Sequence, residues 1–289
     1  KINYYLSKKW GLESRMDSDG DGHTDEAEET AGTSAIDASE LPLPDFSDSV
    51  DAQIGEASGL DSIESDLAGW YDASNVDSIN NASLSSGSIL NTWIDLSGNG
   101  RHGNSSGSPY IVFNKTIGTS SFSNPGVVEF RTSNDYFSVD GDAFEAEYMF
   151  TVFAPRTSTY SHYGTIYGST GSGSGTRTFL FENGQRYFHV TPYPSSAYEN
   201  GIELNSPFKA LGEFMNAKIL EVEFAYPDLE RNYNINRQGI QNSLSNQNDI
   251  AEIIILSRVP TEAERAVINK YLSEKWSINL PEIPDFSDT

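Results

Sequence analysis

The chain of 289 residues contains no cysteine, which excludes disulfide bonds and thiolate metal sites. Basic residues are also scarce, because 18 lysines and arginines stand against 42 aspartates and glutamates, for a net charge of −24. So few cations argue against binding to the phosphates of nucleic acid or to an anionic membrane surface. No stretch approaches the roughly 18 consecutive apolar residues of a membrane span, so we expect neither membrane insertion nor a signal peptide.

Sequence signatures of catalysis are missing as well. The paired-carboxylate string Glu-x-Asp-x-x-Glu, which many glycosidases with a β-sandwich fold carry, does not occur, and residues 168–175 lack the ending of a phosphate-binding loop. The four histidines do not have the spacing of metal ligands: His23, His102, His162 and His189. These absences predict that the chain is not an enzyme, and leave a polysaccharide-active enzyme as the least favoured alternative.

What the chain does have is typical of an all-β protein. It contains 24 glycines, and 15 tyrosines and 15 phenylalanines against 3 methionines, which favours many short strands joined by turns. Asn183-Gly184 predicts a two-residue hairpin turn. Strands are expected at residues 126–130, 136–139, 148–154, 164–167, 177–182, 185–190, 218–224 and 250–256.

The stretch Ile250–Ile278 combines a strand with a helix. A β-branched run is followed by Thr261 and Glu264, which have the spacing of a capping box at a helix start. One stripe of this helix is expected to be apolar, from the helical spacing of Val267, Ile268, Tyr271 and Leu272.

The same stretch is echoed at the beginning of the chain. Ile2–Trp10 matches Ile268–Trp276 at seven of nine positions, and Leu41–Asp48 resembles Leu280–Asp288. The two echoes have offsets of 266 and 240, and the difference of 26 (266 − 240) places an insertion between Trp10 and Pro44. We therefore expect a tandem array, in which residues 1–11 end a preceding repeat as a helix and residues 279–289 link to the next. The expected partners are neighbouring repeats of the same protein.

The insertion coincides with an acidic module, residues 12–40, and a Pro-bounded linker, residues 41–61, follows it. Its core, Asp17 to Glu28, has the pattern of an EF-hand-like calcium loop, with Gly22 where the sharp turn is needed. Because calcium prefers several hard oxygen ligands, we expect it to be the bound cofactor. The predicted metal ligands are Asp17, Asp19, Asp21, Asp25 and Glu28, with the backbone carbonyl of His23. The alternative is a solvated acidic linker.

Two groups of residues in the β region admit two interpretations. Asp95, Ser97, Asn99 and His102 form a polar loop, whose side chains either fix a glycine-rich turn or hold a ligand. Trp70 and Trp93 are expected in the core rather than as platforms for sugars. Possible glycan-binding residues are the loop aromatics Tyr160, Tyr163, Tyr193 and Tyr198, which could equally pack under loops or against a neighbouring subunit.

Residues 62–278 resemble the laminin G-like, concanavalin A-like domains of bacterial surface proteins. The residues that carry the resemblance are Trp70–Ser74, Trp93–His102, Val127–Phe130, Asn134–Phe137 and Ile250–Ile278. The resemblance implies a jelly-roll sandwich of two antiparallel sheets, used for adhesion, glycan binding or surface architecture. The acidic loop resembles the calcium-binding repeats of thrombospondin type 3, although the usual Asp after Gly32-Thr33 is replaced by Ser34.

Together these features predict an all-β, jelly-roll (concanavalin A-like) two-sheet sandwich with a C-terminal helix and a short calcium loop. The expected function is that of a non-catalytic structural or adhesion module of an extracellular, cell-surface or filament-forming protein, stabilised by calcium. A lectin-like module that binds surface glycans is the alternative.

Overall fold

A computed structural model describes residues 8, 9, 18 and 25, and then residues 61–117, 120–122, 126–132, 134–156, 164–170, 178–181, 188–190, 196–204, 216–224, 232–237 and 247–281. The chain divides into two compact units, Lys1–Glu56 and Ala57–Thr289. In the first unit Lys8 and Lys9 are helical. The finer division predicted from the sequence, at residues 12–40 and 41–61, stays a prediction.

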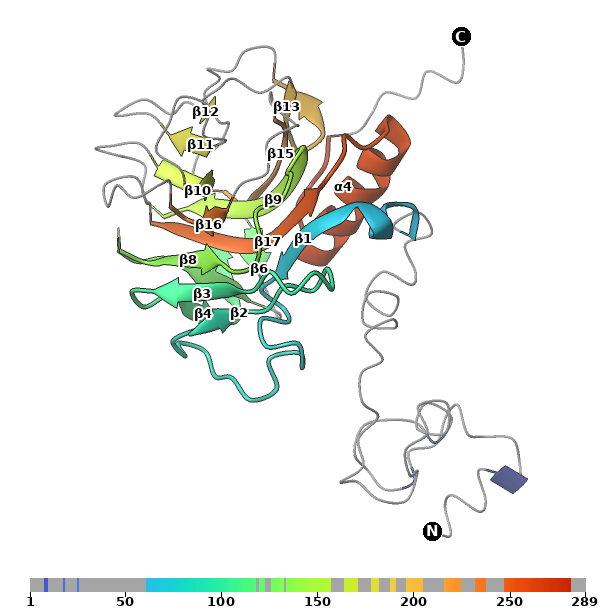
Figure 1. Cartoon of the computed structure of the whole chain (residues 1–289). Coiled ribbons are helices and arrows are strands. Elements are labelled where there is room, and N and C mark those ends of the chain that lie inside the picture. Colours follow the sequence, from blue (N-terminus) through green and yellow to red (C-terminus); the bar gives the residue numbers. More distant parts are fainter. Residues whose placement is uncertain are drawn as a thin grey trace. The chain divides into compact units, whose positions relative to one another are not determined.

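The second unit is an antiparallel two-sheet sandwich with a helix near its C-terminal end, as predicted (Figure 1). Within the described residues the large sheet has the order β14 (Ile202–Glu203), β13 (Ser196–Glu199), β15 (Lys218–Glu223), β9 (Tyr148–Pro155), β17 (Asn248–Leu256), β7 (Val127–Glu129), β4 (Tyr110–Val112), and β1 (Leu67–Asp72) pairs with β17. The small sheet has the order β12 (Phe188–Val190), β11 (Thr178–Phe181), β10 (Gly164–Ser169), β16 (Tyr233–Ile235), β8 (Tyr136–Val139), β3 (Gly103–Ser106), β2 (Thr92–Trp93).

The remaining elements are short, apart from the helix. They are a 3-10 helix η2 (Asp61–Asp66), a separate hairpin of β5 (Lys115–Ile117) and β6 (Ser120–Phe122), and the helix α4 (Glu262–Trp276). Strand β8 has the bounds expected from the sequence. Strands β11 and β12 on either side of Asn183-Gly184 pair antiparallel, as predicted, with Phe181 opposite Phe188. The predicted two-residue turn lies outside the described residues and stays a prediction.

Strand β17 is the centre of the large sheet. It pairs with β9 along its whole length, and its other edge pairs with β7 near Ile250 and with β1 from Glu252 onward. A register shift between Ile250 and Glu252 marks the change of partner. All nine residues of β17 are buried, because the small sheet covers one face and α4 lies against the other.

Aromatic side chains fill the space between the sheets. Tyr71 from the large sheet meets Trp93 from the small sheet edge to face, with ring centroids 6.0 Å apart. Phe130, just after β7, meets Phe137 of β8 at 5.8 Å. Such edge-to-face pairs stabilise a core beyond the apolar area that they bury. Trp70 and Trp93 are 2% and 0% exposed, so both tryptophans are core residues, as predicted.

Helix α4 begins with the predicted capping box. The Thr261 side chain accepts a hydrogen bond from the backbone N–H of Glu264, whose carboxylate accepts one from the N–H of Thr261. The helix ends at Ser277, which adopts the left-handed conformation with φ 54°. The predicted apolar stripe is only partly right, because Asn269 is buried beside Ile268 and Leu272.

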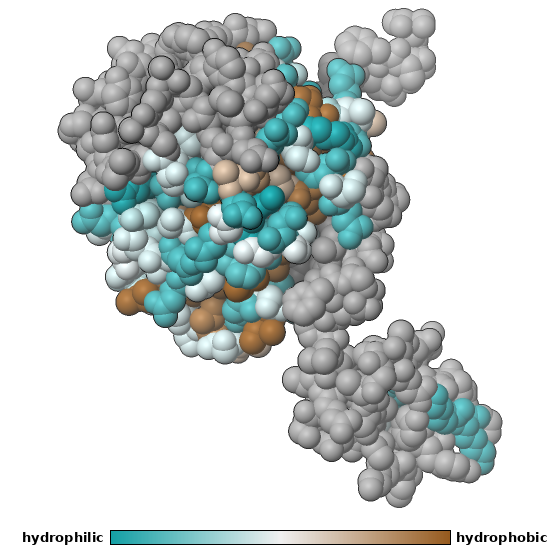
Figure 2. Space-filling model, viewed as in Figure 1, coloured by the Kyte–Doolittle hydropathy of each residue, from teal (hydrophilic) through white to brown (hydrophobic). Residues whose placement is uncertain are grey.

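The outer surface of the described residues is largely hydrophilic on the face seen in Figure 2. Large apolar side chains exposed to solvent are scattered, and belong to Ile79, Ile89, Ile202 and Val259. Within the described ranges, no helix is long and apolar enough to cross a lipid bilayer.

Candidate functional site

The predicted calcium loop is described only at two residues, Ser18 and Asp25. One carboxylate oxygen of Asp25 accepts a hydrogen bond from the Ser18 backbone N–H at 2.9 Å, and the other accepts one from the Ser18 hydroxyl at 2.8 Å. Asp25 is fully buried within its unit. Two residues that are seven positions apart in the sequence thus lie side by side. The other predicted ligands lie outside the described residues: Asp17, Asp19, Asp21, His23 and Glu28.

The described part of the chain contains no group of three or more histidine, aspartate or glutamate side chains that could hold a metal ion. Calcium therefore remains a prediction that rests on the sequence of the loop and on the Ser18–Asp25 contact.

Of the predicted glycan-binding tyrosines, the structure describes Tyr198, while Tyr160, Tyr163 and Tyr193 lie outside the described residues. Tyr198 stands on β13 and is half-buried. The guanidinium of Arg265 in α4 lies 3.4 Å from the centroid of its ring. One face of the ring is thus occupied by a cation–π contact within the protein.

The polar loop after Trp93 fixes the backbone, as the first of its two interpretations predicts. The Asp95 carboxylate accepts hydrogen bonds from the backbone N–H groups of Trp70 at 2.9 Å, Ser97 at 3.0 Å and Arg101 at 3.0 Å. His102 Nδ1 accepts the N–H of Asp95. Asp95 therefore ties β1 to the turn that follows β2.

The most unusual site is a set of buried charges between the large sheet and α4, which we call the helix joint. Its sheet residues are Asp72, Glu221 and Glu252, and its helix residues are Arg265, Asn269, Tyr271, Lys275 and Trp276. All three carboxylates have 0% exposure. A buried carboxylate is costly unless donors surround it, so the contacts of each one decide whether the joint stabilises the fold.

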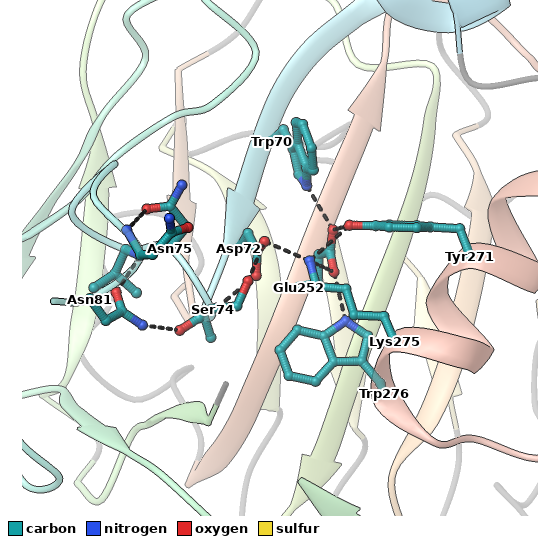
Figure 3. Close-up of polar contacts among 12 residues, drawn as sticks. Trp70, Asp72, Ser74, Asn75, Asn81, Glu252, Tyr271, Lys275 and Trp276 are labelled. Atoms are coloured by element: carbon teal, nitrogen blue, oxygen red, sulfur yellow. Dashed lines mark hydrogen bonds and ion pairs between the residues drawn. The ribbon is translucent and has the colours of Figure 1, made fainter. Parts of the chain in front are cut away.

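Glu252 is the centre of the helix joint. The indole N–H groups of Trp70 and Trp276 donate to its two oxygens at 2.7 and 2.6 Å, and the Tyr271 hydroxyl donates at 3.0 Å. Figure 3 shows these side chains, from β1 and α4, converging on Glu252 in β17. Lys275 Nζ lies 3.0 Å from the same carboxylate. Four donors thus surround a single buried acid.

Lys275 joins this carboxylate to a second one. Its Nζ donates to Asp72 Oδ2 at 2.5 Å, and Asp72 also accepts hydrogen bonds from the backbone and hydroxyl of Ser74. Burial opposes the charged form of Lys275, but the negative charges of Asp72 and Glu252 outweigh it, so the pKa of Lys275 lies well above its ordinary value. Burial raises the pKa of Glu252, against the opposing effect of Lys275.

The third carboxylate of the helix joint, Glu221 of β15, is satisfied in the same way. Arg265 Nε and the Tyr148 hydroxyl donate to one of its oxygens at 2.7 and 2.9 Å, and Asn269 Nδ2 donates to the other at 2.9 Å. Helix α4 is therefore held at two places on the large sheet, about two helical turns apart, by hydrogen bonds to buried acids.

A second charged group lies on the large sheet, on strands β7 and β17. Glu129 and Asp249 are cross-strand neighbours, 5% and 2% exposed, and Lys115 contacts both. Arg131 and Arg156 each reach Glu129 at 2.6 Å. Burial opposes ionisation, but the hydrogen bonds from these three cations outweigh it and lower the pKa of Glu129 to about 2. Burial raises the pKa of Asp249.

One open cavity in the described residues, of about 360 Å³, adjoins the β13–β14 hairpin and the chain that follows α4. It combines polar side chains with apolar ones, and Tyr198 is not among its lining residues. The lining residues are Glu199, Asn200, Ile202, Leu204, Asn279, Leu280 and Pro281.

The sequence did not predict the helix joint. Acidic residues in strands usually face water, and the partners of Glu252 lie as far away in sequence as Trp70. A usable signal was present in the repeat itself, because Lys275 and Trp276 recur as Lys9 and Trp10.

Comparison with known proteins gives no family. No protein-family model and no curated protein matches the chain. Among solved structures it is similar to a Trypanosoma rangeli sialidase in complex with sialic acid, at 9% identity, a TM-score of 0.41, and coverage of 73% of this chain and 33% of that one. It is also similar to an arabinofuranosidase complexed with arabinofuranosyl-α-1,2-xylobiose, at 12% identity, a TM-score of 0.43, and coverage of 65% and 51%.

A third similar structure is the binding domain of botulinum neurotoxin serotype D, at 12% identity, a TM-score of 0.34, and coverage of 73% of this chain and 52% of that one. The chain spans about a third of the sialidase and about half of the other two proteins. None of these three is named as a laminin G domain, so that resemblance stays a prediction.

These comparisons correct one expectation. The prediction that the chain is not an enzyme is contradicted, because the sialidases and the arabinofuranosidase among its similar structures are enzymes. The prediction depended on missing sequence strings, and such strings describe particular families rather than the active sites that a fold can carry. At these identities and TM-scores the likeness assigns no activity to this chain.

Proposed function

We propose that this chain is a structural or adhesion segment of an extracellular protein built from tandem copies of the sandwich, and that calcium stabilises it. The observation that carries the proposal is the helix joint. It fixes the last element of the sandwich to the large sheet through three buried acids, at the point where the chain leaves for the linker that begins at Asn279. A module that bears force or sets the distance to its neighbour is helped by a last element that is firmly attached where the chain leaves the sandwich.

The repeated sequences support the tandem arrangement. Ile2–Trp10 and Leu41–Asp48 recur at Ile268–Trp276 and Leu280–Asp288, so helix and linker return in the same order. Copies joined in this way would be one another's partners. The net charge of −24 suits an extracellular, calcium-containing medium, in which divalent cations screen the repulsion among carboxylates.

Calcium has a defined role in this proposal. Asp17, Asp19, Asp21, Asp25 and Glu28, with the carbonyl of His23, would hold the ion, and the contact between Ser18 and Asp25 supports this assignment. A bound ion would stiffen the chain that leads into the sandwich.

The test is small-angle scattering of the full chain with calcium and with a chelator. We expect larger dimensions and a broader distance distribution after chelation. The variant Asp17→Asn/Asp21→Asn should give the chelated profile even with calcium present. Superimposable profiles with calcium and with chelator would contradict the role of calcium.

Glycan binding is the second candidate, and the cavity beside β13 favours it. Its volume of about 360 Å³ falls within the range of small-molecule sites, and Glu199, Asn200 and Asn279 could bind sugar hydroxyls beside apolar Ile202 and Leu280. A glycan array should then give hits that Asn279→Ala weakens, whereas hits lost on Tyr163→Ala or Tyr193→Ala would point to the loop tyrosines. An array without hits would contradict glycan binding and favour the structural role.

A further inference from the structure

The contacts of α4 explain which residues recur at the beginning of the chain. Within Ile268–Trp276, the two positions that differ in the repeated segment are Lys270 and Glu274, where Tyr4 and Lys8 stand instead. The side chains of Lys270 and Glu274 are 74% and 68% exposed. The other seven positions are all buried or half-buried, and all seven are identical in the two segments.

The identical residues are those that contact the sheet. Asn269 donates to Glu221, Tyr271 and Trp276 donate to Glu252, and Lys275 donates to Asp72 and approaches Glu252. Ile268 and Leu272 supply the apolar contacts, at 0% and 1% exposure. Their counterparts in the first segment are Ile2, Asn3, Tyr5, Leu6, Lys9 and Trp10.

The residues that follow the helix also agree between the two segments. Ser277 follows Trp276 with φ 54°, a conformation that glycine adopts most readily, and the residue that follows Trp10 is Gly11. The next residue, Ile278, is 6% exposed, and its counterpart is the apolar Leu12. The similarity of the two segments therefore includes the residue after the helix, where a left-handed backbone conformation is needed and Gly11 can adopt it.

We infer that Ile2–Trp10 is a docking helix for the outer face of a large sheet in a second copy of this fold, and that this copy carries acids equivalent to Asp72, Glu221 and Glu252. The inference rests on the tandem arrangement proposed above, and identifies the surface through which one copy receives this segment. The recognition chemistry is specific. The ammonium of Lys9, the indole N–H of Trp10 and the hydroxyl of Tyr5 would donate to the acids equivalent to Asp72 and Glu252. The side-chain amide of Asn3 would donate to the acid equivalent to Glu221.

Grafting tests the inference in the full chain. The double substitution Lys270→Tyr/Glu274→Lys converts Ile268–Trp276 into the sequence of Ile2–Trp10. Because both positions are exposed, we expect a Tm within about 2 °C of the parent. The matched control introduces the same residue types one position earlier, as Asn269→Tyr/Ser273→Lys, and should lower the Tm by roughly 10 °C. A graft that destabilises as much as the control would overturn the inference.

A peptide tests docking between separate chains. The full-length variant Leu272→Ala/Trp276→Ala weakens α4, and a synthetic peptide of residues 1–13 in excess should raise its Tm by mass action. The same peptide with Trp10→Ala should have no effect, and one with the exposed Tyr4→Ala should remain active. Rescue by a peptide of residues 262–278 but not by a peptide of residues 1–13 would overturn the inference.

These results are separable from the role of calcium. None of the side chains in the helix joint belongs to the acidic loop, so both experiments should give the same outcome with calcium or with chelator. A failure of the calcium proposal alone would appear in scattering and leave the docking results unchanged.

Discussion

Trp276 donates its indole N–H to Glu252 at 2.6 Å, across the interface between the last helix and the central strand of the large sheet. The acceptor is a fully buried carboxylate that also receives the indole N–H of Trp70. Two indole donors on one acid bring the first strand, the central strand and the helix to a single point.

The variant Trp276→Phe removes the indole N–H of Trp276 together with part of its buried ring. The lost donor to Glu252 and the cavity left by the smaller ring should together cost about 2–4 kcal/mol of unfolding free energy. Chemical denaturation of the parent and the variant measures the difference. Lys270→Ala, on the exposed side of the same helix, is the control and should lie within about 0.5 kcal/mol of the parent. Equal stability of all three proteins would show that the bond contributes little.

Removing the lysine of the helix joint should have a larger effect. Lys275→Met leaves Asp72 and Glu252 buried without their common cation, and should cost about 3–5 kcal/mol. Adding Glu252→Gln removes one of the two unpaired charges, so the double variant should lose less than the sum of the single losses. A double-mutant cycle in urea measures this coupling. If the stability losses of the two single variants add up to the loss of the double variant, Lys275 and Glu252 do not belong to one ion cluster.

The acid sensitivity of the fold should depend on Glu129. Its folded-state pKa of about 2 lies below its ordinary value of 4.5, so its contribution to stability is complete above about pH 5 and is lost as the pH falls through this window. Melting curves at pH 5 and pH 3 should show Glu129→Gln losing less stability than the parent, by on the order of 2 kcal/mol. Glu203→Gln, an exposed carboxylate, is the control. Equal losses in the parent and in Glu129→Gln would contradict the prediction.

The turn held by Asp95 should be sensitive to its carboxylate. Asp95→Ala leaves the N–H groups of Trp70, Ser97 and Arg101 without their acceptor, and should cost about 2–3 kcal/mol. Asp142, which is exposed, provides the matched control as Asp142→Ala. If both variants unfold at the same urea concentration, the loop is not held by Asp95 and a role in binding becomes the better interpretation.

Local patterns in the sequence predicted the elements that depend on neighbouring residues. The capping box of Thr261 and Glu264, the strand Tyr136–Val139 and the hairpin around Asn183-Gly184 all depend on contacts or turn preferences within a few residues. The two-sheet architecture followed from the succession of such strands and from a family resemblance.

The helix joint could not be predicted in this way, because its contacts join residues far apart in sequence. Trp70 meets Glu252 across 182 positions and Asp72 meets Lys275 across 203. Alternation along a strand places an acid toward water unless another element covers it, and only the packing of α4 reverses that expectation for Glu221 and Glu252. The calcium loop is the opposite case, since its ligands lie within Asp17–Glu28 and are readable from spacing alone.

The most direct measurement is a calorimetric titration of calcium into the full chain, because a calcium-stabilised module must bind the ion saturably. We predict saturable binding in the parent, its loss in Asp17→Asn/Asp21→Asn, and its retention in Glu13→Gln/Glu29→Gln, which removes the same charge outside the ligand set. An absence of binding heat in the parent, or equal binding by both variants, would contradict a calcium-stabilised module.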